Sequence, residues 1–523
     1  MFPAPPAPGG AISSLEVFSL SRPHFPLGDY YQLLLKNGLL SDNAPLHADL
    51  TREVRLVSCD SQTVVPGTLF ICKGAAFKPQ YLLDAAEKGA FVYVSQRRWA
   101  ECALPCILVS DIRRAMALLA DRAWDHPSGR LHITGITGTK GKTTTAYFLK
   151  SILDEWRRSQ GRHESAILST IVTDDGVERR PAKLTTPEPL DLQRHLWNAA
   201  ECGAEYLTME VSSQALKYHR TGGVEFSVGV FLNIGEDHIS PVEHPDFEDY
   251  FASKLMIFRQ SAAACVNLDS DFAERILTAA GCCSKIYTFS TKFSTADIYA
   301  SEIRRDGDAT RFLVRTPRYT RELSMGLPGS FNVENALAAV AAAEALGAPE
   351  SAVAAGLAEA AVPGRMETFN TPDGKLTVIV DYAHNGMSLE ALLSSVRREF
   401  PGRQLTVLFG CTGGKGLDRR EGMGQAAGRW ADRIILTEDD PGPEEVPDIC
   451  ADIGRYIAPF GKGWTVIPDR EAAVERAILE AATPAVVVLA GKGAEQQQKR
   501  KHGPEPCVPD ALLARRTLKH YDP

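Results

Sequence analysis

The chain has 523 residues and a formal net charge of −8, with 44% hydrophobic and 23% charged residues. This acidic balance excludes the basic footprint of a nucleic-acid-binding protein, and no run approaches the roughly 20 apolar residues of a membrane helix. Eleven cysteines without a paired framework, and a start without the charged and apolar regions of a signal peptide, favour a cytoplasmic protein.

The length and the pattern of elements predict an α/β fold in three domains, at residues 1–128, 129–361 and 362–523. In the first domain, short apolar strands such as 68–71 and 91–94 alternate with helical stretches. A polar, turn-forming segment ends this domain. We therefore expect a small α/β unit at the N-terminal end.

The second domain is expected to hold a mostly parallel sheet with helices on both faces, because strand-like and helical stretches alternate along it. The third domain shows the same alternation and is expected to form a Rossmann-like α/β unit. The expected strands are 205–210, 228–232 and 264–268 in the second domain and 376–380, 405–409, 433–436 and 485–490 in the third, with an alanine-rich helix at 332–346.

A glycine-rich loop follows the strand-like stretch that ends near Ile136, and an amphipathic helix begins after it. Glycines let backbone N–H groups face phosphate oxygens, the helix start adds positive potential, and a lysine and a hydroxyl can reach the terminal phosphates and Mg²⁺. Because Ile136 replaces the first glycine of the longer motif, the pattern is the shorter G-T-x-G-K-T form. A glycine-rich turn with an incidental lysine is the plainer alternative. The strand, loop and helix together favour an ATP site formed by Gly138, Thr139, Lys140, Gly141, Lys142, Thr143 and Thr144.

Two strand-like stretches end in residues that can bind a metal ion. Glu210 closes one of them and His238 follows another, and a doubly wound sheet presents its ligands at the carboxyl ends of its strands. Taken singly, each is more often a capping or hydrogen-bonding residue. Together, beside a phosphate loop, they indicate an Mg²⁺ that bridges nucleotide and substrate, with Lys142, Glu210 and His238 as catalytic candidates and Thr143 as a further metal ligand.

Taken in chain order, these motifs resemble the Mur ligase family, and most closely the branch that adds the third amino acid to UDP-N-acetylmuramoyl-L-alanyl-D-glutamate. The resemblance covers nearly the whole chain from about Leu56. It implies an N-terminal uridine-nucleotide-binding domain, a central ATPase-like domain and a C-terminal amino-acid-binding domain, with ATP and Mg²⁺ as cofactors. Besides the phosphate loop, it rests on Asp60-Ser61, Thr185-Thr186-Pro187, Glu210-Val211-Ser212-Ser213, Phe331-Asn332-Val333-Glu334-Asn335, Pro363-Gly364-Arg365 and Asp381-Tyr382-Ala383-His384.

The resemblance also implies a role for individual residues. Tyr250 and Lys254 match a Y-x-x-x-K motif whose lysine becomes N6-carboxylated, which would make Lys254 a catalytic residue and a metal ligand. A helical surface lysine is the alternative, since the segment between His238 and Tyr250 is two residues longer than usual. Substrate contacts are implied for Ser61, Thr185, Thr186, Ser212 and Arg220, and ATP contacts for Asn332, Asn335, Arg365, Asp381 and His384.

The residue-selecting domain departs from the family pattern. Lys415-Gly416 stands where the family commonly has an arginine for the carboxylate of the incoming amino acid, with Arg419 or Arg420 as the candidate substitute. Enzymes specific for meso-diaminopimelate have D-N-P-R, whereas this chain has Asp439-Asp440-Pro441-Gly442, and a glycine cannot pair with a carboxylate. The two acids favour an amino acid that ends in an ammonium group, lysine before ornithine. The implied substrate-binding residues here are Asp439, Asp440, Gly491 and Glu495.

The implied reaction forms an acyl phosphate from a substrate carboxylate and ATP, which the amine of the amino acid then attacks. The expected partners are the UDP-N-acetylmuramoyl dipeptide and a free amino acid, bound by a monomer with neither a nucleic-acid partner nor a membrane span.

Two alternatives stay open. A sister amide ligase such as a folylpolyglutamate synthetase would have no use for Asp60-Ser61 or Thr185-Thr186-Pro187. An inactive ATP-binding partner protein would explain Lys415-Gly416 and Ala494, but not the retention of Lys142, Glu210, His238 and Lys254.

Overall fold

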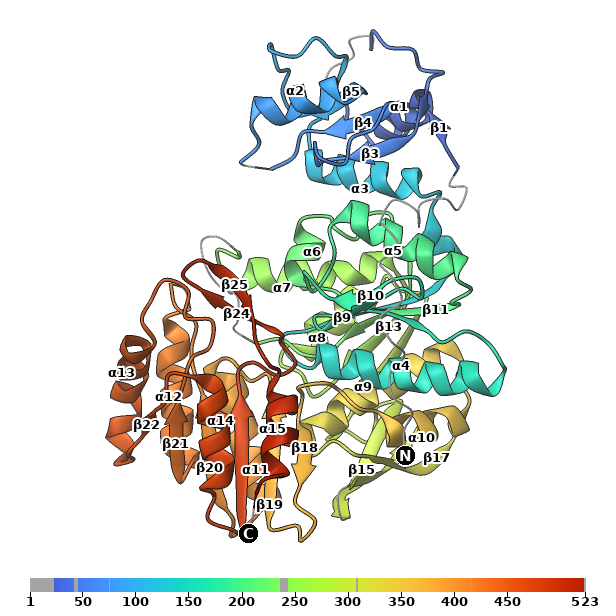
Figure 1. Cartoon of the computed structure of the whole chain (residues 1–523). Helices are drawn as coiled ribbons and strands as arrows, with labels where there is room; N and C mark the ends of the chain where they lie inside the picture. The colour runs from blue at the N-terminus through green and yellow to red at the C-terminus, as the bar shows by residue number, and fades with distance from the viewer. Residues whose placement is uncertain are drawn as a thin grey trace. The chain divides into compact units, whose positions relative to one another are not determined.

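The computed structural model describes residues 23–41, 46–74, 76–235, 243–306, 309–414 and 416–521. The chain folds into two compact units (Figure 1). The first unit comprises residues up to 132 together with 186–205 and 213–225, and the second comprises the remainder. The division into domains at 128/129 and 361/362 stays a prediction.

The first unit is built on a small parallel sheet with the strand order β3-β4-β5-β6. Its strands alternate with helices, as the pattern of apolar runs predicts, and a short antiparallel pair, β1 and β2, lies apart from the sheet. The elements are β1 (Phe25–Pro26), α1 (Leu27–Lys36), β2 (Glu53–Val54), β3 (Leu56–Ser58), β4 (Thr68–Ile71), α2 (Pro79–Glu87), β5 (Ala90–Ser95), β6 (Cys106–Leu108), α3 (Ile112–Ala123) and η2 (Pro127–Arg130).

Two helices from later in the chain, α5 (Pro189–Glu201) and α6 (Ser213–Lys217), belong to this first unit. The rings of Trp124 and Trp197 lie 6.1 Å apart between the end of α3 and α5. Gly223 lies so close to Asp121 that an added Cβ would come within 2.6 Å of the carboxyl carbon. The N-terminal core is therefore completed by residues far beyond position 128, which the sequence alone did not predict.

The second unit contains a sheet of 11 strands in the order β10-β9-β8-β11-β7-β12-β13-β14-β15-β16-β17. The strands from β8 to β15 in this order run parallel, whereas β10, β9, β16 and β17 pair antiparallel at the two edges. The prediction of a mostly parallel sheet is thus correct for the centre of the sheet, and the antiparallel strands at its two edges were not predicted. The strands are β7 (His132–Thr137), β8 (Ala166–Leu168), β9 (Val172–Asp174), β10 (Arg179–Pro181), β11 (Tyr206–Glu210), β12 (Phe226–Phe231), β13 (Ser261–Asn267), β14 (Lys285–Ser290), β15 (Ile298–Asp306), β16 (Ala309–Arg315) and β17 (Thr320–Met325).

Helix α9 (Ser330–Leu346) explains why the alanine-rich stretch lacks a polar face. Its residues from Ala336 to Ala343 are fully buried, and the helix packs on α4 (Lys142–Ser159) and on the sheet. Small side chains allow the close approach that a helix buried on all sides needs. The other helices of this part are α7 (Phe247–Leu255), η3 (Met256–Gln260), α8 (Ala273–Ala280) and α10 (Glu350–Glu359).

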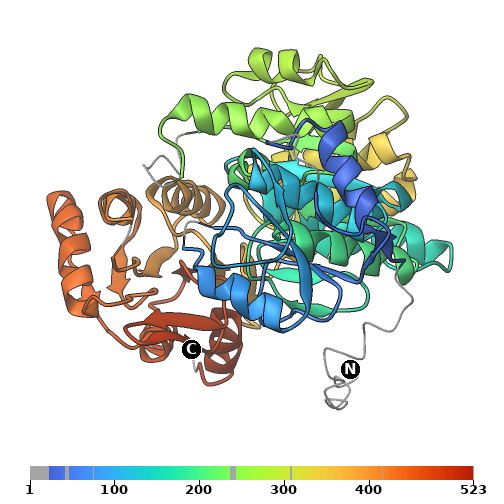
Figure 2. The ribbon, with the colours of Figure 1, turned by 90° about the horizontal axis from the view of Figure 1, so that it is seen from above.

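The C-terminal part of the second unit has its own six-stranded sheet, in the order β18-β19-β23-β20-β21-β22. Helices α11 (Gly386–Glu399), α12 (Asp418–Trp430) and α13 (Val446–Ile457) share one hydrophobic cluster with the sheet, and α14 (Arg470–Leu479) and α15 (Asp510–Leu518) share another (Figures 1 and 2). This two-sided cover confirms the expected Rossmann-like arrangement. The strands are β18 (Glu367–Asn370), β19 (Leu376–Asp381), β20 (Gln404–Phe409), β21 (Arg433–Leu436), β22 (Thr465–Val466) and β23 (Ala485–Ala490); η4 (Ala458–Phe460) and a hairpin of β24 (Gln497–Arg500) and β25 (Gly503–Pro506) complete this part.

Across the described ranges, no helix combines the length and the apolar character needed to cross a membrane.

Candidate active site

The phosphate loop joins the end of β7 to the start of α4, as the sequence predicts. Gly138 and Gly141 have φ values of 152° and 86°, which L-residues with side chains rarely adopt. The Lys142 ammonium donates to the carbonyl of Gly138 at 2.8 Å and to that of Thr139 at 3.2 Å. Thr143 and Thr144 lie buried in the first turn of α4. The loop therefore has the backbone shape and the cation of a phosphate site.

Two asparagines outside the loop fix its conformation. Asn233, after β12, accepts from the Lys140 N–H at 2.8 Å and donates to the Lys140 carbonyl at 3.2 Å. Asn335 donates to Asn332 at 3.1 Å, and its side-chain oxygen would lie 2.1 Å from a Cβ at Gly141. Of the predicted pair on α9, Asn335 therefore lies against the loop and Asn332 holds Asn335. Asn233 was missed because its only sequence signal is its place after a strand.

Lys254 lies on α7, with 2% of its surface exposed. Its ammonium donates to the carbonyl of Gly138 at 2.9 Å and lies 4.6 Å from the centre of the Tyr250 ring. The Tyr250 hydroxyl in turn lies 3.1 Å from the hydroxyl of Thr139. Lys254 is thus a buried residue beside the phosphate loop, and the alternative of a surface lysine is wrong.

Glu210 ends β11 with 1% of its surface exposed. One carboxylate oxygen accepts from the Thr170 N–H at 2.8 Å and the other lies 3.1 Å from the Thr170 hydroxyl. That hydroxyl also lies 3.3 Å from the Thr185 hydroxyl. Thr170, which sequence reasoning missed, orients the proposed metal-binding carboxylate. The half-buried Ser212 follows the same strand, and His238 lies outside the described residues.

Three predicted residues of the C-terminal part lie near the phosphate loop or each other. Arg365 donates to the Thr143 hydroxyl at 3.5 Å and stacks on Tyr382 at 4.6 Å. Asp381 accepts from the N–H groups of Met366 and Ala383, and burial raises the pKa of its carboxyl. His384 Nδ1 donates to the Tyr382 carbonyl at 2.8 Å.

Burial lowers the pKa of His384 to about 3, and the nearby cations Lys140, Arg419 and Arg365 lower it further. The imidazole is therefore neutral at physiological pH, with Nε2 left as an acceptor. Arg420, one candidate substitute for the missing arginine, is buried between Glu444 and Asp452, each 2.8 Å away. Arg419 has no ion pair with any described residue, so it is the better placed of the two to meet an anion.

In the first unit, two of the predicted substrate residues, Thr186 and Arg220, lie at an ion-pair network. Arg220 contacts Glu188 at 2.9 Å and the Thr186 carbonyl at 3.4 Å, and Lys73 forms a second ion pair with Glu188. Ser61 is buried, and its carbonyl accepts from Lys88 at 2.9 Å. Glu188 and Lys73 thus support Arg220, and neither carries a motif that would have identified it.

The region predicted to select the amino acid lies at the ends of neighbouring parallel strands, β19, β23, β20 and β21. Gly410 follows β20, Asp439 follows β21 and Gly491 follows β23. An added Cβ at Gly491 would lie 2.3 Å from Asp439 Oδ2, and one at Gly410 would lie 2.9 Å from Asp439 Cβ. The two glycines therefore leave room for the aspartate between strand ends.

Asp439 is buried but forms no hydrogen bond or ion pair with any residue that the structure describes. Burial raises the pKa of its carboxyl to about 7, against the opposing effect of Arg470 and Lys492. Arg470 is already held by Asp510 through two bonds of 2.8 and 2.6 Å. Asp439 is thus a buried acid that a cationic ligand would stabilise in its charged form.

Asp440 and Glu495 are held by cations of the chain itself. Asp440 accepts from the ammonium of Lys492 at 2.9 Å and from that of Lys499 at 3.0 Å. Burial would raise the pKa of Asp440, but the hydrogen bonds from Lys499 and Lys492 outweigh it and lower the pKa. Glu495 contacts Lys492 at 2.7 Å and accepts from the Tyr382 hydroxyl at 3.0 Å.

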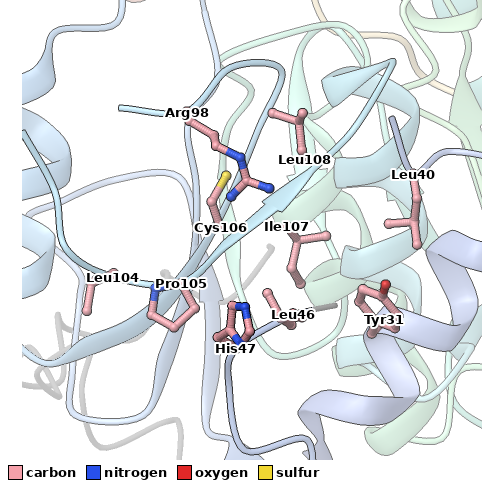
Figure 3. Close-up of a pocket in the computed structure, with 10 residues that line it drawn as sticks. All are labelled: Tyr31, Leu40, Leu46, His47, Arg98, Leu104, Pro105, Cys106, Ile107 and Leu108. Atoms are coloured by element: carbon pink, nitrogen blue, oxygen red, sulfur yellow. The ribbon is translucent and has the colours of Figure 1, made fainter. Parts of the chain in front are cut away.

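A cavity of about 290 Å³ lies in the first unit (Figure 3). It borders β6, whereas Ser61 follows β3 at the opposite edge of the same sheet. No predicted site residue lines it; the lining residues are Tyr31, Leu40, Leu46, His47, Arg98, Leu104, Pro105, Cys106, Ile107 and Leu108.

Two family descriptions match the chain over the parts that carry this geometry. The Mur ligase middle domain matches residues 136–343, and the Mur ligase glutamate ligase domain matches residues 364–493. The chain belongs to the Mur ligase family. This membership confirms both the resemblance seen in the motifs and the predicted fold class.

Several Mur ligases resemble the chain over most of its length. The UDP-N-acetylmuramoyl-L-alanyl-D-glutamate–L-lysine ligase of Enterococcus faecalis is 40% identical, over 88% of this chain and 91% of its own. The ligase of the same name from Streptococcus sanguinis is 40% identical, over 84% and 88%. The UDP-N-acetylmuramyl-tripeptide synthetase of Lactobacillus delbrueckii subsp. bulgaricus is 37% identical, over 94% and 98%.

Solved Mur ligase structures share the fold. A UDP-N-acetylmuramoyl-L-alanyl-D-glutamate–2,6-diaminopimelate ligase superposes with a TM-score of 0.67 at 26% identity, covering 95% of this chain and 99% of the other. A MurF ligase from Thermotoga maritima in complex with ADP superposes with a TM-score of 0.59 at 18% identity, covering 90% and 97%.

Proposed function

We propose that the protein is an ATP-dependent ligase that adds L-lysine to UDP-N-acetylmuramoyl-L-alanyl-D-glutamate in peptidoglycan synthesis. The observation that carries the choice of lysine is Asp439, a buried carboxylate without a partner among the described residues. Gly442 stands where diaminopimelate enzymes have an arginine, so a second carboxylate on the amino acid would meet no cation there. Relatives named as L-lysine ligases support the same assignment.

The phosphate loop binds the nucleotide in this proposal. Backbone N–H groups at the start of α4 and the Lys142 ammonium stabilise the charge on the phosphates while a substrate carboxylate attacks the γ-phosphorus and displaces ADP. Asn335, which is bonded to Asn332, packs against Gly141 of the loop, and Arg365 adds a cation beside Thr143. The neutral His384 presents an acceptor nitrogen to the same region.

The residues around the loop fit a magnesium ion. The Thr143 hydroxyl, the Glu210 carboxylate and an N6-carboxylated Lys254 would be hard oxygen ligands, which Mg²⁺ prefers, with His238 as a further ligand. The ion would supply charge neutralisation at the phosphates. Thr170 holds the Glu210 carboxylate through two contacts of 2.8 and 3.1 Å, so that its orientation is fixed before the ion binds.

In the second half-reaction, the amine of lysine attacks the acyl phosphate and phosphate leaves. Asp439, with Glu495 nearby, accepts the side-chain ammonium, which places the α-amine for attack. Ser61, Thr185, Thr186, Ser212 and Arg220 bind the UDP-linked substrate. The substrates place the reaction in the cytoplasm, with the protein acting as a monomer.

Product analysis tests this function. The wild-type protein and the K142A variant are incubated with ATP, Mg²⁺ and the UDP-N-acetylmuramoyl dipeptide, and with lysine, ornithine or meso-diaminopimelate in turn. We expect phosphate release and a lysyl product by mass spectrometry from the wild type alone. A diaminopimelate product would overturn the choice of lysine, and a folded, ATP-binding protein without any product would overturn the ligase.

A further inference from the structure

The loop that carries Asp439 is fastened to the β24–β25 hairpin. The Lys499 ammonium contacts Asp440 Oδ2 at 3.0 Å, and the Lys499 N–H donates to Asp440 Oδ1 at 2.9 Å. The Gly442 N–H donates to the Lys499 carbonyl at 2.9 Å. Arg500 donates to Glu438 at 2.8 Å. We call these four contacts the hairpin clamp; they hold the loop on both sides of Asp439.

The backbone of the loop separates neighbouring carboxylates. Asp440 has a φ of 49°, a left-handed conformation that aspartate and asparagine tolerate better than most residues. Because of this turn, Asp440 meets the hairpin while Asp439 lies against Gly491. Glu438 is also buried and pairs with Arg500. Asp439 alone of these three acids is left for a ligand.

The carboxylates around the loop outnumber the cations that contact them. Lys492 contacts Asp440 and Glu495, Lys499 contacts Asp440, and Arg500 contacts Glu438 and Glu505. Arg470 adds no free cation, since Asp510 pairs with it. Among the described residues none of these cations contacts Asp439, so an ammonium group on a ligand would pair with it.

We propose that Lys499 and Arg500 are positioning residues that set the affinity for the incoming amino acid by holding the loop of Glu438 to Gly442. They contact no substrate and act through Asp439. It follows that Asp440 anchors the hairpin and is not a ligand of the amino acid, because its two oxygens are already occupied by Lys492 and Lys499. This inference rests on the proposed lysine-adding function.

Steady-state kinetics of the full-length enzyme test the clamp. Because the Lys499 side chain is 60% exposed, solvent weakens its ion pair, and K499M alone is expected to raise the KM for lysine only about threefold. The double variant K499M/R500M removes both cations and is expected to raise it about tenfold or more. The kcat and the KM for ATP stay unchanged, and K499R restores the lysine KM of the wild type.

The matched control is K501M, since Lys501 is an exposed lysine at the tip of the same hairpin without an ion pair to any described residue. We expect K501M to behave as the wild type. If K499M/R500M matches K501M, or if it changes the KM for ATP as much as that for lysine, the clamp has no positioning role.

Hydrogen exchange separates failure of the clamp from failure of the function. In K499M/R500M without any substrate, the backbone N–H groups of Glu438, Asp439, Asp440 and Gly442 should exchange faster than in K501M, and those of the phosphate loop should not. Unchanged exchange at 438–442 overturns the clamp even if lysine is the substrate. If exchange at these residues is faster but the enzyme uses another amino acid, the hairpin clamp is supported and only the assignment of lysine as the substrate is wrong. The KM is then measured for that amino acid.

Discussion

The phosphate loop and the residue-selecting region sit at the same kind of place, the carboxyl ends of parallel strands, but they are built differently. The phosphate loop lies within residues 138–144 and presents N–H groups and ammonium groups. The predicted selecting region collects residues from 410 to 495, and it contains an acid, Asp439, that has no partner among the residues the structure describes. The loop for the phosphates is thus local in the sequence, whereas the region expected to select the amino acid is assembled from several strand ends.

The two regions share one device. Each contains a left-handed glycine pressed against a functional side chain: Gly141 (φ 86°) against Asn335 and Gly491 (φ 106°) against Asp439. The two regions belong to one unit but differ in charge and in expected ligand. A single substitution in one region should therefore change the KM for its own ligand and leave the KM for the other ligand unchanged.

The largest effect is expected at Lys142. Replacement of Lys142 by alanine removes the ammonium at the phosphates and should lower kcat by about a thousandfold or more, as measured by ADP release. K140N in the same loop is the comparison, since its backbone bonds to Asn233 remain, and it should stay within about tenfold of the wild type. Equal losses in both would show that the loop depends on its total charge and not on Lys142.

The next effect is expected at Asp439. D439N keeps the shape but removes the charge, and it should raise the KM for lysine about a hundredfold with the KM for ATP unchanged. D448N, at an exposed position on α13, is the control. An unchanged lysine KM in D439N would assign the ammonium to another group.

Smaller effects are expected at Gly141 and Gly491, and these two effects test directly whether the two regions are independent. G141A should raise the KM for ATP and G491A the KM for lysine, each about twentyfold, because the new methyl group displaces Asn335 or Asp439 and the backbone is strained. G402A is the control for strain, since Gly402 is also left-handed (φ 77°) but has nothing within 4 Å of an added Cβ. If both variants raise both KM values, the two regions are not independent.

The smallest effect comes from pH. The pKa of Asp439 is raised to about 7, so the carboxyl takes up a proton as pH falls through 7, and an ammonium ligand loses its partner. The side-chain ammonium of lysine stays protonated over this range. The KM for lysine should therefore rise about tenfold between pH 8 and pH 6, and the KM of D439N should not. The same pH dependence in D439N would point to a different group.

The sequence allowed the phosphate loop, the place of Glu210 at a strand end and the alternation of strands with helices to be predicted, because each is a local pattern: a glycine spacing, a strand end, an alternation of apolar runs. Thr170, Asn233 and Lys499 could not be predicted, since each acts through a contact with a residue at least 40 positions away. Asp440 shows the same limit. The charge of Asp440 suggested a substrate contact, but the sequence does not show that Lys492 and Lys499 bind its carboxylate.

The interleaving of the two compact units bears on how the protein is made. The chain passes between them at 132/133, 185/186, 205/206, 212/213 and 225/226. During synthesis on the ribosome, the N-terminal core therefore cannot be completed until α5, α6 and the chain up to residue 225 have emerged. By then β7, the phosphate loop and α4 have already been synthesised. A gene fragment that ends at residue 128 would lack Trp197, which packs on Trp124, and Gly223, which packs on Asp121, so the smallest excisable piece of this enzyme is larger than its first sheet suggests.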